Sequence, residues 1–164
     1  MTEPRWLDET EMRAWAGFLE TSNLLAKLVE TQLRDVGSVT QVQYEILTRL
    51  HESAGLRSRM TELAHAMVCS RSGLTYQVAQ MEKAGLLRRE TDPDDERGVF
   101  AVLTPDGLEV LARTAPGHVG VVREGFLDAL TPRDLAQLAA IMDRTRAHLK
   151  SLVDVQPPRR VPHD

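Results

Sequence analysis

The sequence predicts a mainly α-helical single domain with one small β-hairpin. Most apolar residues recur at three- and four-residue spacing, as they do on the buried face of a helix. The period changes to strand-type runs most clearly between residues 86 and 103. The 164 residues are also enough to build a hydrophobic core without disulfide or metal staples.

The composition is that of an ordinary globular protein, with 42% apolar and 27% charged residues. No apolar run approaches the ~20 residues that cross a bilayer, and the acidic N-terminus lacks the apolar core of a signal peptide. The single cysteine, Cys69, excludes an intrachain disulfide and suits a reducing compartment. We therefore expect a cytoplasmic protein without a membrane partner.

Long amphipathic helices are predicted at both ends of the chain. The first covers about residues 7–34, and its apolar stripe is wide enough to pack on two surfaces. A second begins at Thr104-Pro105, and Pro116-Gly117 is expected to kink or break it. The last begins at Thr131, where the sequence combines a capping box with a proline at the first helical position. Its apolar stripe needs a partner, such as the first helix of a second subunit. The proline-rich tail, 154–164, is expected to be disordered.

The middle of the chain alternates short elements. Thr40 and Gln43 have the spacing of a capping box at the start of a helix. A short strand near 56–59 and a short helix over 60–67 follow, and Ser70 then caps a helix that Gly85 ends. Two strands, 86–91 and 99–103, flank the polar connection 92–98.

This order of elements is the winged helix-turn-helix plan, whose second helix enters the DNA major groove. Leu74, Val78 and Met81 form its buried face, which leaves an outward set: Arg71, Ser72, Thr75, Tyr76 and Ala79. Arg71 is suited to pair bidentately with guanine or with phosphate. Tyr76 is suited to donate to phosphate or to pack on a thymine methyl. Hydroxyls near a helix N-terminus suit phosphate oxygens.

The hairpin is the predicted wing, and Arg97 is the one basic residue of its tip, 92–98. Asp95 is placed to hold Arg97 extended, so that the arginine enters the minor groove. Arg88 and Arg89 open the wing. They either contact phosphate or pair with Glu90 or Asp92 across the hairpin, and the sequence leaves both alternatives open.

The charge balance allows a second function. The net charge is -4, and residues 49–97 hold eight acidic and eight basic residues. A DNA-binding surface therefore requires the positive charges to be sorted onto one face. The alternative is a ligand- or protein-binding dimer without DNA affinity.

The run from Met60 to Gly107 resembles the MarR family (multiple antibiotic resistance regulators). The matching pieces are SRSGLT…V…ME..GL..R on the second helix and D.DERG….LT..G through the hairpin. With the flanking helices, the resemblance covers about residues 7–153. It implies a homodimer that represses transcription from a palindromic operator and is released by a small ligand.

The resemblance also implies the domain layout and the site. Helices over about 7–35 and 105–153 would form the dimer around a DNA-binding lobe at about 40–104. DNA contacts are implied for the recognition helix and the wing, at Ser70, Arg71, Ser72, Thr75, Tyr76 and Arg97, with Asp95 steadying the wing arginine. Many relatives carry an arginine where Tyr76 stands, which leaves the contact there and the operator sequence open.

For an effector, the resemblance places His118 beside a crevice between the dimer base and the DNA-binding lobe. Trp15, Phe18 and Tyr44 are the expected aromatic walls of a pocket for a phenolic or carboxylate ligand. The alternative is a set of ordinary core aromatics beside a solvated histidine.

Other kinds of site have weaker support. Cys69 is expected to be a small buried residue of the turn, with a redox sensor as the alternative because a helix N-terminus lowers a thiol pKa. His65 and Cys69 are four residues apart, but zinc needs two further ligands, so neither a metal nor another cofactor is expected. The sequence contains no glycine-rich phosphate loop, serine nucleophile elbow or HExxH motif, so we do not expect an enzyme.

Overall fold

The computed structural model describes residues 4–67, 69–93 and 95–154 of the chain. The chain divides into two compact units, the first ending at Arg123 and the second beginning at Glu124. Helices dominate both units, and the first also holds a three-stranded antiparallel sheet, which confirms the predicted fold class. Within the described residues, no helix is both long and apolar enough to cross a membrane.

Helix α1 (Glu9–Gly37) begins at a capping box. The Asp8 carboxylate accepts from the Glu11 N–H at 2.8 Å, and the Asp8 N–H donates to the Glu11 carboxylate at 3.0 Å. The helix ends at Gly37, three residues beyond its predicted end. A Cβ atom on Gly37 would lie well inside contact distance of the Thr114 methyl group. Gly37 therefore allows α1 and α5 to approach each other closely.

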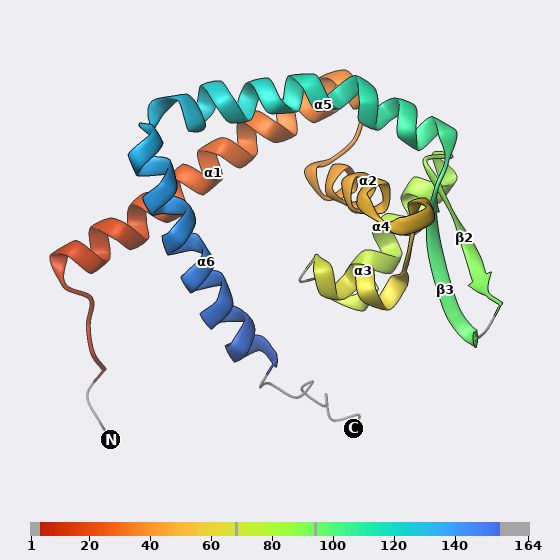
Figure 1. Ribbon diagram of the computed structural model, residues 1–164, viewed down its shortest axis with the longest axis horizontal. Helices are drawn as coiled ribbons and strands as arrows, with labels where there is room; N and C mark the ends of the chain where they lie inside the picture. Colours follow the sequence, from red (N-terminus) through yellow and green to blue (C-terminus); the bar gives the residue numbers. More distant parts are fainter. Residues whose placement is uncertain (1–3, 68, 94, 155–164) are drawn as a thin grey trace, which may run out of the picture. The chain divides into compact units, whose positions relative to one another are not determined.

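Helix α5 (Pro105–Gly125) runs alongside the C-terminal part of α1 (Figure 1). Buried Val29 and Leu33 of α1 pack in one cluster with Val110, Val121 and Val122 of α5. The sequence predicts a kink or a break at Pro116; the helix is continuous through this residue, so the predicted break is wrong. Proline removes only one helical hydrogen bond, and the packing on α1 to both sides of that position maintains the helix.

The DNA-binding lobe expected from the sequence begins with helix α2 (Gln41–Glu52). Its predicted capping box is confirmed, with the Thr40 N–H donating to Gln43 at 3.0 Å and the Gln43 N–H to Thr40 at 3.2 Å. A short 3-10 turn, strand β1 (Arg57–Arg59), helix α3 (Met60–Ala66) and helix α4 (Arg71–Lys83) follow. These helices and the hairpin that follows them bury a common core. It includes Ile46, Leu47, Leu50, Leu63, Leu74, Val78, Met81, Leu87 and Leu103.

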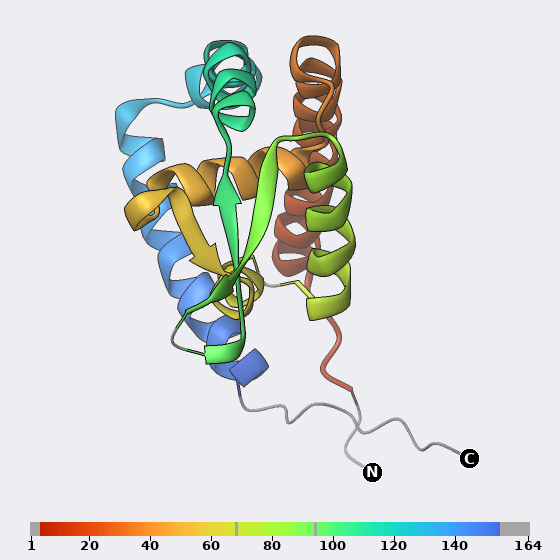
Figure 2. The same ribbon diagram turned by 90° about the vertical axis from the view of Figure 1, so that its right-hand side faces the viewer.

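The sheet has the order β1-β3-β2, with β2 (Leu87–Asp92) and β3 (Asp95–Leu103) forming the hairpin. Leu87 pairs with Leu103 at its base, and the register shifts between Thr91 and Asp92. β3 begins within the stretch predicted to be a polar connection, so the hairpin is longer than the sequence indicated. It extends to one side of α2, α3 and α4 (Figures 1 and 2).

The second unit contains a short 3-10 turn (Leu127–Ala129) and helix α6 (Pro132–Asp154). The capping box predicted at the start of α6 is confirmed. The Asp134 N–H donates to the Thr131 hydroxyl at 3.3 Å, and the Thr131 N–H donates to the Asp134 carboxylate at 3.1 Å. Several apolar side chains of α6 are exposed, namely Ile141, Met142, Leu149 and Leu152. The tail predicted to be disordered lies, beyond Asp154, outside the described residues.

Candidate nucleic-acid interface

Helix α4 has one buried and one exposed face. Leu74, Val78 and Met81 point into the core and are at most 2% exposed. Ser70 caps the helix as predicted, because its Oγ accepts from the Gly73 N–H at 3.1 Å. The opposite face and the first turn are therefore open to solvent.

All of the α4 side chains predicted to contact DNA are exposed: Ser70, Arg71, Ser72, Thr75 and Tyr76. Tyr76 is the most prominent large side chain, with 62% of its surface exposed. The Thr75 hydroxyl donates to the Arg71 carbonyl at 2.7 Å, which keeps it on the helix. Within the part of the chain that the structure describes, the Arg71 guanidinium has no ion-pair partner. It is thus a cation that an anion can approach directly.

Cys69 precedes the cap of α4 and is exposed, so the prediction of a small buried residue is wrong. Its backbone N–H donates to the Ala64 carbonyl of α3 at 3.3 Å. This bond closes the turn between the two helices through the backbone, while the core is filled by Leu63 and Leu74. The thiol therefore lies at the surface beside the N-terminus of α4.

The two arginines at the base of the wing form ion pairs. Arg88 donates from Nε to Glu90 at 2.7 Å, which is one of the two alternatives left open by the sequence. Arg89 pairs across to Glu82 of α4, with an Nε to Oε2 distance of 2.9 Å. The hydrogen bonds from Arg89 lower the pKa of Glu82. The Arg97 side chain lies outside the described part of the structure, and so the proposed contact between Asp95 and Arg97 stays a prediction.

Strand β1 supplies two arginines that the sequence analysis missed. The Arg59 guanidinium contacts the carboxylate of Asp92 and lies 3.5 Å from that of Asp95. The Arg57 guanidinium lies 4.6 Å from the centre of the Phe100 ring. The alternation Arg57-Ser58-Arg59 in a predicted strand could have indicated that both arginines lie on one face of the sheet.

A groove of about 380 Å³ separates the exposed side of α4 from the wing. Thr75 lines it from α4, and Gly98 and Val99 line it from β3. Its remaining lining residues come from β1, the start of α3 and both strands of the hairpin, namely Arg59, Met60, Thr61, Arg89 and Asp95. The recognition helix and the wing are therefore neighbouring projections with a partly cationic cleft between them.

The four residues predicted to line a ligand pocket form two separate pairs. The rings of Tyr44 and His118 lie 4.7 Å apart, centre to centre, between α2 and α5. Trp15 and Phe18 stack at 6.2 Å on α1, and both are about half exposed. Tyr44 packs against the cluster of Val29, Leu33 and Val39. An α-helix rises about 1.5 Å per residue, so Trp15 lies roughly 20 Å along α1 from Val29, the nearest member of that cluster in the helix.

The Tyr44–His118 pair includes one buried polar atom without a hydrogen-bond partner among the described residues, on His118. Burial lowers the pKa of His118 and raises that of Tyr44. The His118 Nδ1 and the Gln32 Oε1 are buried without a hydrogen-bond partner among the described residues. Gln32 reaches α5 from α1, where its Nε2 donates to the Thr114 carbonyl at 3.3 Å. The contact region of α1, α2 and α5 thus keeps unused hydrogen-bonding capacity.

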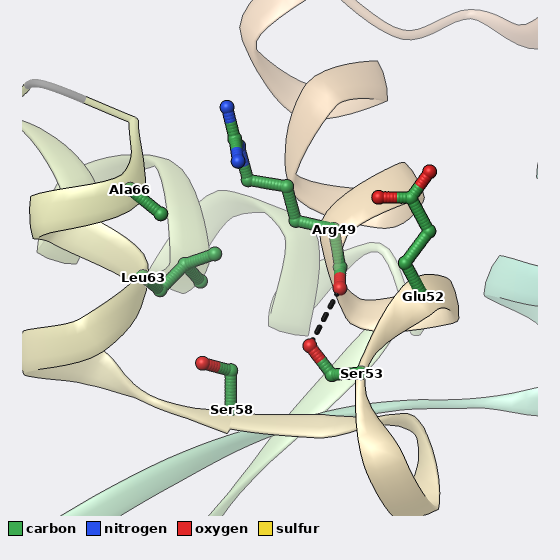
Figure 3. Close-up of a pocket in the computed structure, with 6 residues that line it drawn as sticks. All are labelled: Arg49, Glu52, Ser53, Ser58, Leu63 and Ala66. Carbon is green, nitrogen blue, oxygen red and sulfur yellow. Dashed lines mark hydrogen bonds between the residues drawn. The ribbon is translucent and has the colours of Figure 1, made fainter. Parts of the chain in front are cut away.

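A second hollow, of about 180 Å³, lies between α2, β1 and α3 (Figure 3). Its Ser53 hydroxyl donates to the Arg49 carbonyl at 2.7 Å, and the Arg49 guanidinium pairs with Glu45 at 2.8 Å. These bonds hold the Ser53 hydroxyl and the Arg49 guanidinium against neighbouring groups of α2. Across residues 4–67, 69–93 and 95–154, no three histidine, cysteine or acidic residues form a group that could hold a metal.

Comparisons with known proteins agree with this arrangement. A sequence model of the MarR family matches residues 39–99. The transcriptional regulator HosA of Escherichia coli O111:H- is 34% identical over 98 residues, which are 59% of this chain and 70% of HosA.

Two similar solved structures come from Streptomyces coelicolor. AbsC, a MarR family transcriptional regulator, is 44% identical with a TM-score of 0.86, and the match covers 90% of this chain and 99% of AbsC. Sco3205, another MarR family transcriptional regulator, was solved in complex with DNA. It is 40% identical with a TM-score of 0.83, over 98% of this chain and 97% of its own. All three relatives are transcriptional regulators. The chain therefore belongs to the MarR family of DNA-binding, winged helix-turn-helix transcriptional regulators.

Proposed function

We propose that this regulator is a cytoplasmic homodimeric repressor that binds a palindromic operator and releases it when a small phenolic or carboxylate ligand binds. The observation that carries the proposal is the exposed polar face of α4 next to the projecting hairpin. A helix of this kind fits the major groove while a ribbon beside it reaches the neighbouring minor groove. The similarity to Sco3205, which was solved with DNA, supports the same mode of binding.

Within α4, Arg71, Thr75 and Tyr76 are the proposed base-reading residues. Arg71 has a planar fork of donors, which suits the two acceptors of guanine. Ser70 and Ser72 lie in the first turn, where hydroxyls and backbone amides suit a phosphate oxygen. The exposure of all five side chains supports these roles.

In the wing, Arg97 is proposed to enter the minor groove with Asp95 orienting it, and Arg88 is proposed to contact phosphate. The ion pair of Arg88 with Glu90 is exposed, with 54% and 38% of the two side chains accessible. Exposed pairs of this kind contribute little stability. Arg88 can therefore leave Glu90 and pair with a DNA phosphate at little cost in free energy.

The dimer is proposed to form through α1 and α6. Each helix exposes apolar side chains at helical spacing, including Met12, Trp15, Phe18 and Leu19 of α1 and Ile141, Met142, Leu149 and Leu152 of α6. Large exposed apolar surfaces of this kind mark interfaces. A two-fold dimer would present two α4 helices, and hence require two half-sites of opposite orientation. Sedimentation should give twice the 18.3 kDa mass of one chain.

A fluorescence anisotropy titration tests the DNA-binding proposal. Fragments selected from genomic DNA would supply the operator, and Arg71→Ala and Arg97→Ala should each weaken binding by about 1–3 kcal/mol. Arg113→Ala is the matched control, because this exposed arginine of α5 donates to the Val36 carbonyl, away from α4. Affinity should fall steeply with salt. Equal affinity for all three variants would remove Arg71 and Arg97 from the DNA-binding site. A flat salt response, or the failure to select any fragment, would favour the alternative of a dimer without DNA affinity.

The proposed effector site lies at Tyr44 and His118, and the buried unpartnered atoms of His118 and Gln32 support it. A phenolic or carboxylate ligand could supply the missing hydrogen bonds. Titration of a hydroxybenzoate panel into the DNA complex tests this. Tyr44→Phe and His118→Gln should bind DNA normally but lose the response, whereas a response that persists in both variants would place the effector elsewhere.

A further inference from the structure

Strand β1 joins the recognition half of the lobe to the wing. Its last residue, Arg59, is followed directly by α3 at Met60, and α3 leads into α4. On its other side, Arg59 pairs with Phe100 of β3. A side chain at this position is thus attached by its backbone to the elements that carry α4, and it faces the hairpin.

The pairing of β1 ends before the outer part of the hairpin. Its three residue pairs with β3 run from Arg57–Val102 to Arg59–Phe100. Residues 95–99 of β3 lie beyond this point, where the described pairing of β3 is with β2. Backbone pairing with β1 therefore holds the inner part of the wing but not its outer part.

The Arg59 side chain extends across this gap. Its guanidinium contacts the Asp92 carboxylate on β2 and lies 3.5 Å from the Asp95 carboxylate on β3, and it stands 5.6 Å from the centre of the Phe100 ring. A planar guanidinium carries five donors in a rigid fork, so it can hold two carboxylates in a fixed geometry, whereas an ammonium group is a point charge on a flexible stem. One side chain therefore ties both strands of the outer wing to β1.

The hairpin is shaped to receive this arginine. Asp92 is only 4% exposed, and the register shift of the hairpin falls between Thr91 and Asp92. A Cβ atom on Gly98 would lie 2.8 Å from the Asp92 Cβ, so glycine leaves the space in which Asp92 sits. A carboxylate buried to this extent requires a cationic or hydrogen-bonding partner, and Arg59 supplies a cation.

We propose that Arg59 is a positioning residue for DNA binding: by binding Asp92 and Asp95 it sets the angle of the wing against α4. The groove between these projections is lined by Arg59 itself, by Asp95 and by Thr75 of α4. A change in wing angle changes the width of this groove and moves Arg97 relative to the recognition helix. The inference rests on the proposed contact of Arg97 with DNA.

A double-mutant cycle with Arg97→Ala tests the proposal. Arg59→Ala should weaken operator binding on the order of tenfold or more, as Arg97→Ala does. Because Arg59 would act through the wing, the double variant should bind no more weakly than the weaker single variant. If the two losses multiply, or if Arg59→Ala lowers the salt slope in the Arg97→Ala background, Arg59 contacts phosphate itself and the proposal is wrong.

Arg57→Ala is the matched control, because it removes the same charge from the same strand and a contact with the same Phe100 ring. It should change affinity much less than Arg59→Ala, and an equal loss would overturn the proposal. Arg59→Lys keeps the charge but replaces the rigid guanidinium fork with a flexible ammonium group, which holds the two carboxylates less firmly. It should bind more weakly than the wild type with an unchanged salt slope, and wild-type affinity in this variant would also overturn the proposal.

Amide hydrogen exchange on the full-length variants gives a readout that does not depend on DNA. Arg59→Ala should speed exchange at residues 95–99 and leave residues 101–103 near their wild-type rates. Unchanged exchange at 95–99 would overturn the positioning role. If Arg97→Ala left DNA affinity unaltered, the proposed wing contact would fail, while exchange would still decide whether Arg59 holds the wing.

Discussion

Gly107 lies where the first turn of α5 meets the chain leaving α4, and its replacement by alanine should destabilise the protein. A Cβ atom on Gly107 would lie well under 3.0 Å from the Leu86 carbonyl oxygen and 2.7 Å from the Leu103 Cδ1. The Leu86 carbonyl accepts from the Thr104 N–H at 3.3 Å, and the Thr104 hydroxyl caps α5 by accepting from the Gly107 N–H at 3.1 Å. The obstacle is therefore a bonded backbone group, which cannot rotate away.

The magnitude follows from two opposing effects. Overpacking of a filled site costs about 1–3 kcal/mol and occasionally more. Alanine gains up to about 1 kcal/mol over glycine in a helix interior, and less in the first turn. The obstacle is backbone, so we expect the overpacking cost of Gly107→Ala to lie at the upper end of this range. After the gain from alanine is subtracted, the free energy of unfolding should fall by about 2 kcal/mol. For a chain of this size, that corresponds to about 4–8 °C in melting temperature.

Urea unfolding at a fixed protein concentration measures the effect, with Gly120→Ala of the same helix as control. A Cβ atom on Gly120 meets nothing within 4 Å, so this variant should be unchanged or more stable by up to about 1 kcal/mol. If Gly107→Ala were as stable as the wild type, the close approach of α5 to Leu86 would not constrain the fold and the reasoning would be refuted.

Three further predictions concern the site. Ser70→Ala should lose about 1 kcal/mol of stability with the cap, whereas Ser70→Asp should keep the cap but weaken DNA binding by repelling phosphate; equal DNA affinity of the two variants would argue against a phosphate near Ser70. Burial lowers the pKa of His118 below the 6.5 of a free imidazole, so the unfolded chain takes up the proton more readily and the free energy of unfolding should fall as the pH drops through about 6.5. His118→Gln should reduce this dependence, and an unchanged pH profile in urea unfolding would contradict the assignment. Because Cys69 is exposed beside the cap of α4, peroxide should release DNA from the wild type but not from Cys69→Ser if the thiol is a sensor, and release from both would exclude that role.

The local structure of this chain follows from its sequence. The starts of α2, α4 and α6 were predicted from Thr40, Ser70 and Thr131, because a cap is a contact between residues at most three positions apart. The buried face of α4 followed from the helical spacing of its apolar residues, so the exposed face that carries the proposed site was predicted as well. These features depend on neighbours in the chain, which the sequence displays directly.

The sequence left undetermined what depends on distant residues. Pro116 predicts a kinked or broken helix from local rules, yet α5 does not break, because α1 packs against it on both sides of the proline. Gly37 lies next to Thr114 of α5, seventy-seven positions further on, and its missing side chain leaves the space for that residue. Arg59 gave no local signal that its partners would be Asp92 and Asp95, more than thirty positions further on. Short-range hydrogen bonds and periodicity determined the elements, whereas only the tertiary structure decided which side chains meet, because those contacts depend on packing that brings remote segments together.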